Sequence, residues 1–288
     1  MKKFTKVLSI IMAFAMLAAL ATACGTEEAP VADNAAQDDV VVVDYSKSVE
    51  NANIVAEAGS AGEELANGNE FFANAKFTPV DSMSKALMDV SSGVSDIAIV
   101  DYVTAIGSIG EGTDLAGLSI VEGKDFSPEQ YGIAFRKGSD AVVEVNKIIA
   151  DLMADGTMDK IADKYKLGEL LIKDGAAQED SISEGDLAYI KDKGELIIGI
   201  TLFAPMNFED DNKELTGFET EFAKAVCEKL GVTPKFEVIN WNAKEVELNA
   251  KNIDCIWNGM TITDERLETM SISAPYMENK QVMVSKTK

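Results

Sequence analysis

Residues 195–231, ELIIGITLFAPMNFEDDNKELTGFETEFAKAVCEKLG, place a short apolar run ahead of an amphipathic one. The pattern predicts a strand over 196–201 and a helix that opens at Thr216-Gly217 and ends at Gly231. Apolar residues recur every four positions from Phe218 to Leu230, as one buried helix face requires. Residues 252–277, NIDCIWNGMTITDERLETMSISAPYM, then begin with a second apolar strand, over 253–257.

The same alternation of strand and helix continues on both sides of these stretches. Further strands are predicted over 53–58, 77–80, 96–100, 131–136, 235–239 and 281–285, and further helices over 82–91, 139–154 and 157–166. Strands that alternate with helices are typical of an α/β protein, so we expect mixed, mostly parallel sheets.

The first residues have the pattern of an export signal. Lys2, Lys3 and Lys6 precede an apolar run over 7–20, which is shorter than the roughly 20 residues of a membrane span. Cys24 follows small residues and resembles the lipidated cysteine of bacterial lipoproteins, although Ala21 stands where leucine is usual. We therefore predict a signal peptide over 1–23 and lipidation of Cys24, with the polar residues 24–39 as a flexible tether.

Composition excludes several classes of function. The formal net charge is −23, which opposes nucleic-acid binding because phosphates need a basic face. The chain has no histidine, and besides Cys24 it has only Cys227 and Cys255, so neither a zinc site nor a histidine-based triad is expected. These two cysteines lie in apolar patterns and are predicted to be buried free thiols, with a disulfide as the alternative. No cofactor or metal is expected.

The two quoted stretches resemble the N-terminal half of the bacterial extracellular solute-binding proteins of family 3, which bind amino acids for ABC importers. Four earlier segments resemble the C-terminal half of the same family: IVAEAGSAGEE (54–64), SDIAIVDYVTA (95–105), EQYGIAFRKGSD (129–140) and LMADGTMDKIADKYKLGE (152–169). The halves stand in reversed order. The resemblance therefore implies a two-lobed periplasmic-binding-protein-like fold of type 2, with a cleft between the lobes, in a circularly permuted chain.

In this arrangement residues 40–130 form lobe 2, 131–172 return as a hinge strand and helices to lobe 1, 173–185 are a polar linker, and 186–288 form the main part of lobe 1. We expect one covalent hinge crossing, at 131–135. The second crossing would be restored by pairing of 40–43 or neighbouring residues with 281–285. A domain-swapped dimer and a fragment of a tandem array are the alternatives to permutation.

The resemblance also implies groups that bind the carboxylate of a free amino acid. Arg266 would pair with it through two parallel hydrogen bonds, and Arg136 is the only other arginine. Thr261 and the backbone of Gly259 would add contacts, and from lobe 2 the turn at Gly59 and Ser60 would offer backbone donors ahead of a helix. Without the resemblance, Arg266 reads as a helix-surface cation and the turn as an ordinary loop.

The remaining predicted site residues concern the ammonium and the side chain of the ligand. Asp101, after an apolar strand, would accept the ammonium, and Phe203 and Trp241 would wall the side chain. A helix cap and core packing are the respective alternative readings. Glu57 would favour a basic ligand if it lies in the cleft.

These features predict a substrate-binding lipoprotein, not an enzyme, on the extracellular face of the membrane. Its partners would be a polar or basic free amino acid, the permease of an ABC importer, and the membrane through the lipid anchor. A monomer is expected, with a swapped dimer as the alternative. The competing functions are a ligand-binding sensor or co-receptor and a dehydratase-like enzyme that uses Glu57.

Overall fold

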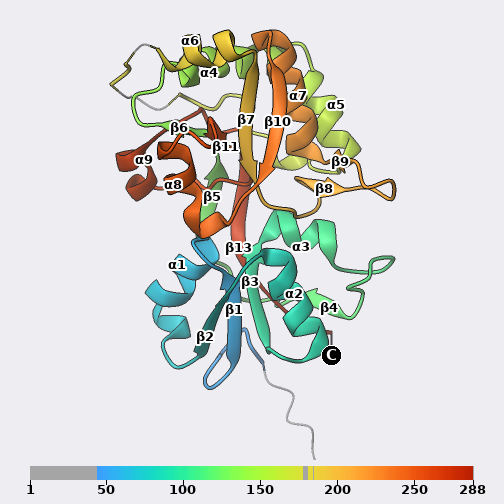
Figure 1. Cartoon of the computed structure of the whole chain (residues 1–288). Helices are drawn as coiled ribbons and strands as arrows, with labels where there is room; N and C mark the ends of the chain where they lie inside the picture. Colours follow the sequence, from blue (N-terminus) through green and yellow to red (C-terminus); the bar gives the residue numbers. More distant parts are fainter. Residues whose placement is uncertain (1–43, 178–180, 184, 288) are drawn as a thin grey trace, which may run out of the picture. The chain divides into compact units, whose positions relative to one another are not determined.

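The computed structural model describes residues 44–177, 181–183 and 185–287. Lobe 2 is built on the first of its two large sheets (Figure 1). The strand order is β2 (Lys76–Val80), β1 (Asn53–Glu57), β3 (Ile97–Asp101), β13 (Met277–Lys286) and β4 (Leu118–Ile120), with β5 (Pro128–Tyr131) pairing with β13. The first three strands are parallel, and β13 runs antiparallel to β3 and β4.

Helices cover both faces of this sheet because its inner strands are apolar on both sides. Alternate residues of β3 face two separate clusters: Ala98 and Val100 pack with α2 (Met83–Ser92), whereas Ile97 and Ile99 pack with α1 (Ala61–Gly68) and η1 (Glu70–Phe72). This period of two buries all five residues of β3. α3 (Tyr102–Ser108) follows β3 directly.

Lobe 1 contains the second sheet, with the same two-sided burial. Its order is β10 (Thr233–Val238), β7 (Glu195–Ile200), β11 (Cys255–Ile256), β6 (Ala134–Arg136) and β12 (Met270–Ile272). One face packs against α4 (Ala141–Ala154), α5 (Thr157–Lys164) and α7 (Phe218–Leu230), and the other against α8 (Lys244–Asn249) and α9 (Asp264–Thr269). The remaining elements are η2 (Gly168–Leu170), α6 (Asp186–Lys193), the hairpin β8 (Phe208–Glu209) and β9 (Leu215–Thr216), and η3 (Trp241–Ala243).

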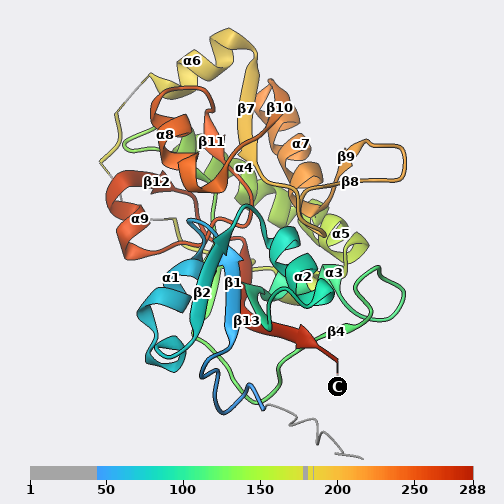
Figure 2. The ribbon, with the colours of Figure 1, turned by 60° about the horizontal axis from the view of Figure 1, so that its bottom comes forward.

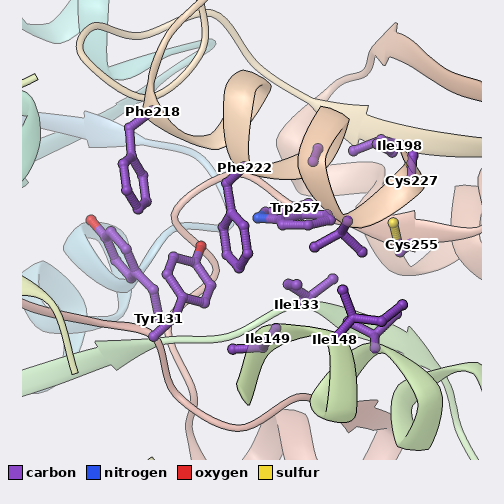
Figure 3. Close-up of a cluster of buried hydrophobic side chains, with 14 of the residues drawn as sticks. Tyr131, Ile133, Ile148, Ile149, Ile198, Phe218, Phe222, Cys227, Cys255 and Trp257 are labelled. Atoms are coloured by element: carbon purple, nitrogen blue, oxygen red, sulfur yellow. The ribbon is translucent and has the colours of Figure 1, made fainter. Parts of the chain in front are cut away.

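Aromatic side chains fill the core beneath α7 (Figure 3). The ring of Phe222 meets Trp257 edge-on, with centroids 4.8 Å apart and planes at 89°. Cys227 and Cys255 are buried in the same cluster and are free thiols, which confirms the prediction.

None of the helices in the described part of the chain combines the length and the apolar character of a membrane span.

The chain crosses from one lobe to the other twice, whereas only one covalent crossing was predicted. The predicted strand over 131–136 is divided into β5, in the sheet of lobe 2, and β6, in that of lobe 1. After β12 the chain enters β13, which continues into the sheet of lobe 2 (Figure 2). Residues 281–285 pair with β3 and β4. Their predicted partner, residues 40–43, lies outside the described residues. Assigning all of 186–288 to lobe 1 was wrong for β13, because its residues 281–286 complete the ladder of lobe 2.

Both sheets are complete within one chain. β6, from the first half of the sequence, lies between β11 and β12, and β13, from the second half, lies between β3 and β4. A swapped dimer is therefore not needed to complete either lobe.

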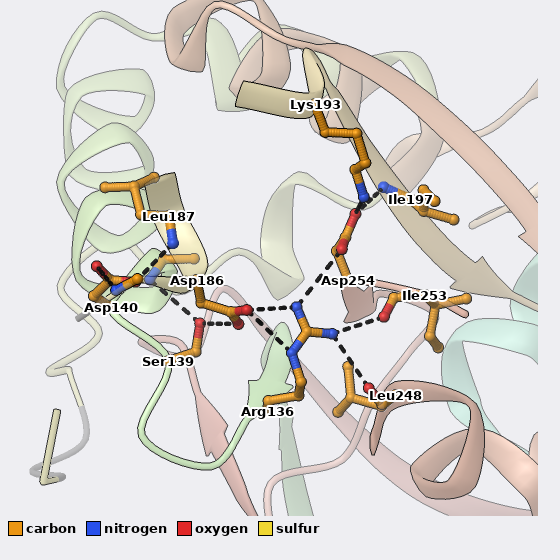
Figure 4. Close-up of polar contacts among 12 residues, drawn as sticks. Arg136, Ser139, Asp140, Asp186, Leu187, Lys193, Ile197, Leu248, Ile253 and Asp254 are labelled. Carbon is orange, nitrogen blue, oxygen red and sulfur yellow. Dashed lines mark hydrogen bonds and ion pairs between the residues drawn. The ribbon is translucent and has the colours of Figure 1, made fainter. Parts of the chain in front are cut away.

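A buried ion network fastens α6, which follows the predicted linker 173–185, to the sheet of lobe 1 (Figure 4). Arg136 donates from Nη2 to Asp186 Oδ1 at 2.7 Å and from Nη1 to the carbonyl of Ile253 at 2.8 Å. Lys193 at the end of α6 pairs with the buried Asp254 at 2.5 Å. Residues 178–180 and 184 of the linker lie outside the described residues.

Replacement of Arg136 by methionine should destabilise the protein by about 3–5 kcal/mol, because Asp186 and Asp254 would lose a buried cationic partner. Urea unfolding would measure the change. The control is Lys213→Met, since the Lys213 side chain is 81% exposed, and it should stay within about 0.5 kcal/mol of wild type. A loss below about 1 kcal/mol for Arg136→Met would contradict this role of the network.

Candidate functional site

The predicted site residues come from loops at the carboxyl ends of strands in both lobes. Glu57 ends β1 and Asp101 ends β3, and these neighbouring strands are parallel, so both acids lie at one edge of the sheet of lobe 2. From lobe 1, Gly259 and Thr261 follow β11, and Arg266 lies on the next helix, α9. All five residues are enclosed by protein, and the buried side chains among them must be satisfied by other protein groups, by water or by a ligand.

Arg266 is buried and reaches across to lobe 2. Its side chain is 5% exposed, and Nη1 donates to the carbonyl of Thr261 at 2.9 Å. Nη2 donates to Glu64 Oε1 on α1 at 2.7 Å, whereas the Glu64 side chain is 50% exposed. Thr263 caps α9 through the backbone amide of Arg266, which fixes the base of the side chain. A partly exposed carboxylate of the protein thus occupies one arm of the buried guanidinium.

Asp101 is the centre of a hydrogen-bond network that sequence reasoning missed. Tyr131 donates its hydroxyl to Asp101 Oδ2 at 2.6 Å, and Gln281 donates to Oδ1. Gln281 also donates to Glu129 Oε2 at 3.0 Å, and Thr261 donates to the same oxygen at 3.2 Å. Burial raises the pKa of Asp101, and burial together with the charge of Asp101 raises the pKa of Glu129 to about 7. A carboxylate has about four acceptor positions, so Asp101 retains capacity for a further donor.

Glu57 is buried with an unsatisfied oxygen. The residue is 2% exposed, and Oε1 has no hydrogen-bond partner among the described residues. Burial, and then the negative charge of Asp101, raise the pKa of Glu57 to about 8, while the positive charge of Lys244 lowers it. Glu57 therefore faces the protein interior rather than solvent.

Lys244, another residue that sequence reasoning missed, is buried beside Glu57. Nζ donates to the carbonyl of Gly59 in lobe 2 at 2.9 Å and to that of Trp241 at 3.4 Å, and lies 5.0 Å from the centroid of the Trp241 ring. Burial, and then the positive charge of Arg266, lower the pKa of Lys244 to about 8. Its place in a short amphipathic helix gave no sequence signal, because lysine is ordinarily a surface residue there.

The turn at Gly59 and Ser60 is fixed by two hydrogen bonds with Glu63 that resemble a capping box, except that the return bond comes from Gly59, the residue before the N-cap. Ser60 Oγ accepts from the amide of Glu63 at 3.2 Å, and the amide of Gly59 donates to Glu63 Oε2 at 2.6 Å. Gly59 has φ +74°, and a Cβ there would lie 2.9 Å from the Cα of Asn242 in lobe 1. Only glycine permits this close approach of the lobes.

The two predicted aromatic walls are almost entirely buried. Phe203 and Tyr131 both lie against Gly259, where an added Cβ would be 3.1 Å from the ring of Phe203. Trp241 packs in the apolar cluster beneath α8, below the amine of Lys244. The amide of Gly259 donates to the buried Glu219 at 2.8 Å, and burial raises the pKa of Glu219 to about 7. Among the described residues, no group of three His, Cys, Asp or Glu side chains is placed to hold a metal ion.

The fold is that of a two-lobed α/β solute-binding protein. Residues 196–288 match the family described as bacterial extracellular solute-binding proteins, family 3, which confirms the resemblance found in the sequence. The matched region contains Phe203, Trp241, Gly259, Thr261 and Arg266, together with Lys244.

Relatives match part of the chain. The L-cystine-binding protein TcyJ of Escherichia coli (strain K12) is 34% identical over 114 residues, which are 39% of this chain and 43% of that protein. The octopine-binding periplasmic protein of Rhizobium meliloti is 39% identical over 74 residues, covering 26% of this chain and 25% of that protein. The arginine-bound form of domain 1 from TmArgBP is 28% identical, with a TM-score of 0.29, and covers 34% of this chain and 85% of that one. The chain thus spans less than half the length of these two curated relatives.

The buried acids predict that stability falls as pH rises. Glu57 has an ordinary pKa of 4.5 and a folded pKa of about 8, so between these values the unfolded state binds fewer protons and the free energy of unfolding decreases. Glu129 and Glu219, each with a folded pKa of about 7, also lower the free energy of unfolding as the pH rises to that value. Lys244 has the opposite effect above about 8, because there the unfolded state binds more protons. We expect a stability minimum near pH 8 for the ligand-free protein.

Urea unfolding from about pH 5 to about pH 8 would test this, with a slope of up to about 1.4 kcal/mol per pH unit for each proton involved. Glu57→Gln should flatten the fall, because the neutral amide has no proton to lose. Glu111→Gln, at an exposed position, should follow wild type. Equal slopes for Glu57→Gln and wild type would show that Glu57 does not titrate in this range.

Proposed function

We propose that the protein binds a free α-amino acid between its lobes and delivers it to the permease of an ABC importer. The observation that carries the proposal is the buried guanidinium of Arg266, which faces the acids of lobe 2 and already holds a carboxylate, that of Glu64. The matching family and the names of the cystine-binding and octopine-binding relatives support the same class of ligand.

In this proposal the ligand carboxylate replaces Glu64 at Arg266. The exchange is favourable because Glu64 is half exposed and can return to water, whereas Arg266 stays buried and needs an anion. Thr261, Gly259 and the turn at Gly59 and Ser60 would complete the carboxylate site by exchanging bonds, because the donors of Thr261, Gly259 and Gly59 are held by Glu129, Glu219 and Glu63 in the ligand-free protein.

Asp101 accepts the ligand ammonium. Phe203 and Trp241 limit the space for the side chain, and Glu57 contributes to the choice of a polar or basic ligand. Because the cations belong to lobe 1 and the acids to lobe 2, the ligand favours the closed state over an open one, and closure follows from that difference in affinity.

Location follows from the first residues. The family is described as extracellular, and we propose that the mature chain begins at Cys24, carries a lipid there and is held at the membrane by residues 24–39. These residues lie outside the described part of the chain. A sensor or co-receptor would use the same binding site without an importer, and a neighbouring permease and ATPase gene pair would favour transport.

The first experiment is a thermal-shift and calorimetric screen of the soluble protein, starting after Cys24, against the common amino acids and L-cystine. One ligand should bind with an affinity on the order of 1 μM and raise the melting temperature. Arg266→Ala should weaken binding by about 100-fold or more, because two charge-assisted hydrogen bonds are lost.

The matched variant is Glu64→Gln, which removes the competing carboxylate and leaves the guanidinium free, so it should bind at least as tightly as wild type. If no amino acid binds to the folded protein, the proposal is wrong. Conversion of a bound ligand to a product would instead support the dehydratase alternative.

We also propose that the chain is a circular permutation of the family order. Support comes from the two ends of the described chain, because Asp44 and Tyr45 line one pocket together with Ser285 and Lys286. The ordinary order would be obtained by joining these neighbouring ends and opening the chain within the linker 173–185.

A reordered chain would test the permutation, with residues 185–287 first, a short glycine-serine joint, and residues 44–172 last. It should keep the ligand specificity of wild type, with an affinity within about tenfold, because every strand pairing is retained. An insoluble or unfolded reordered chain would count against the proposed permutation.

A further inference from the structure

Besides Glu64, which is held by Arg266, and Glu129, which is held by Thr261 and Gln281, the interlobe site contains two cations and two acids, whereas one amino-acid head needs one of each. Arg266 and Lys244 come from lobe 1, and Asp101 and Glu57 from the ends of adjacent strands of lobe 2. The four groups are close enough to act on one another: Arg266 affects the pKa of both Asp101 and Lys244, and Lys244 and Asp101 both affect the pKa of Glu57. A single head at Arg266 and Asp101 leaves the second pair without a ligand partner.

The second pair has unused hydrogen-bonding capacity. Glu57 is 2% exposed and its Oε1 has no partner, which is costly for a buried carboxyl group. Lys244 has three donors, of which two point at the carbonyls of Gly59 and Trp241. An acceptor and a donor, whose charges act on each other, therefore remain available in the same site.

The signs of these two groups restrict the ligand. A basic side chain would be attracted by an ionised Glu57 and repelled by Lys244, and an acidic side chain would be repelled by an ionised Glu57 and attracted by Lys244. A ligand ammonium beside Glu57 favours the ionised form. A dipolar group satisfies both at once.

We propose that Lys244 and Glu57 form a second head-group subsite, which binds the distal amino-carboxylate of a ligand with two amino-acid heads. Lys244 donates to the distal carboxylate and Glu57 accepts from the distal ammonium. The substrate class is therefore a diamino dicarboxylic acid. This inference rests on the proposed function, since the first head occupies Arg266 and Asp101.

A purely structural role for Lys244 makes a different prediction. Its bond to the Gly59 carbonyl joins the two lobes, so a lysine that only holds the lobes together would support every ligand equally. The ratio of affinities for two-headed and one-headed ligands separates the two roles.

Calorimetry on the soluble protein would use two probe pairs, in each of which hydrogen replaces one head. These are L-cystine with S-methylthio-L-cysteine and L-cystathionine with S-ethyl-L-cysteine. Disulfide probes are suitable because Cys227 and Cys255 are buried. In wild type, at least one two-headed probe should bind about 100-fold tighter than its one-headed partner.

Lys244→Met and Glu57→Gln should each reduce that ratio to about tenfold or less, and the exposed control Lys213→Met should keep it. Circular dichroism and a cooperative thermal transition would establish that each variant is folded. If the two-headed and one-headed probes of both pairs bind wild type with nearly equal affinity, the second subsite is overturned. It is also overturned if Lys244→Met weakens binding of both members of a pair equally. Arg266→Ala should weaken all four probes, and if no probe binds to the folded wild-type protein, the proposed function fails together with the subsite.

Discussion

Opposite charges buried between two lobes are the constraint on which this structure depends. Arg266 and Lys244 project from lobe 1, and Asp101 and Glu57 from lobe 2, and each is almost free of water. Removing a charge from water costs several kcal/mol unless it gains partners. The closed arrangement is therefore stable only when something supplies the missing hydrogen bonds.

Groups of the protein itself supply some of these bonds. Glu64 reaches Arg266, the Gly59 carbonyl accepts from Lys244, and Tyr131 and Gln281 donate to Asp101. These substitutes differ in how easily they can be displaced. Glu64 is half exposed and can return to water, whereas Tyr131 is fully buried and fixed by the core. In the proposed function a ligand would therefore displace Glu64 from Arg266. Tyr131 and Gln281 would stay in place and orient the carboxylate of Asp101.

Much of the fold, but less of the site, could be predicted from the sequence. Apolar runs such as 97–100 identify buried strands directly, and the four-residue repeat from Phe218 identifies α7, because both patterns reflect local periodicity. Arg266 was singled out by its motif, and the structure buries it where the lobes meet. Glu64, Lys244 and Gln281 were not, because each stands at a position where a polar residue ordinarily faces solvent, and only the meeting of the lobes buries or pairs it. The length of β13 was also missed, since its first residues alternate with polar ones.

Strand neighbours, rather than chain order, decide whether such a fold can form. β13 lies between β3 and β4, and β6 between β11 and β12, so each lobe receives one strand from the other half of the sequence. Joining the halves through residues 173–185 costs only loop-closure entropy, which grows slowly with length. The pairing of Arg136 with Asp186 then fixes the first turn of α6 at the end of that connection. With both crossings covalent, the reversed order proposed for the halves would leave the hinge intact, and the groups that meet between the lobes remain on the two sides of that hinge.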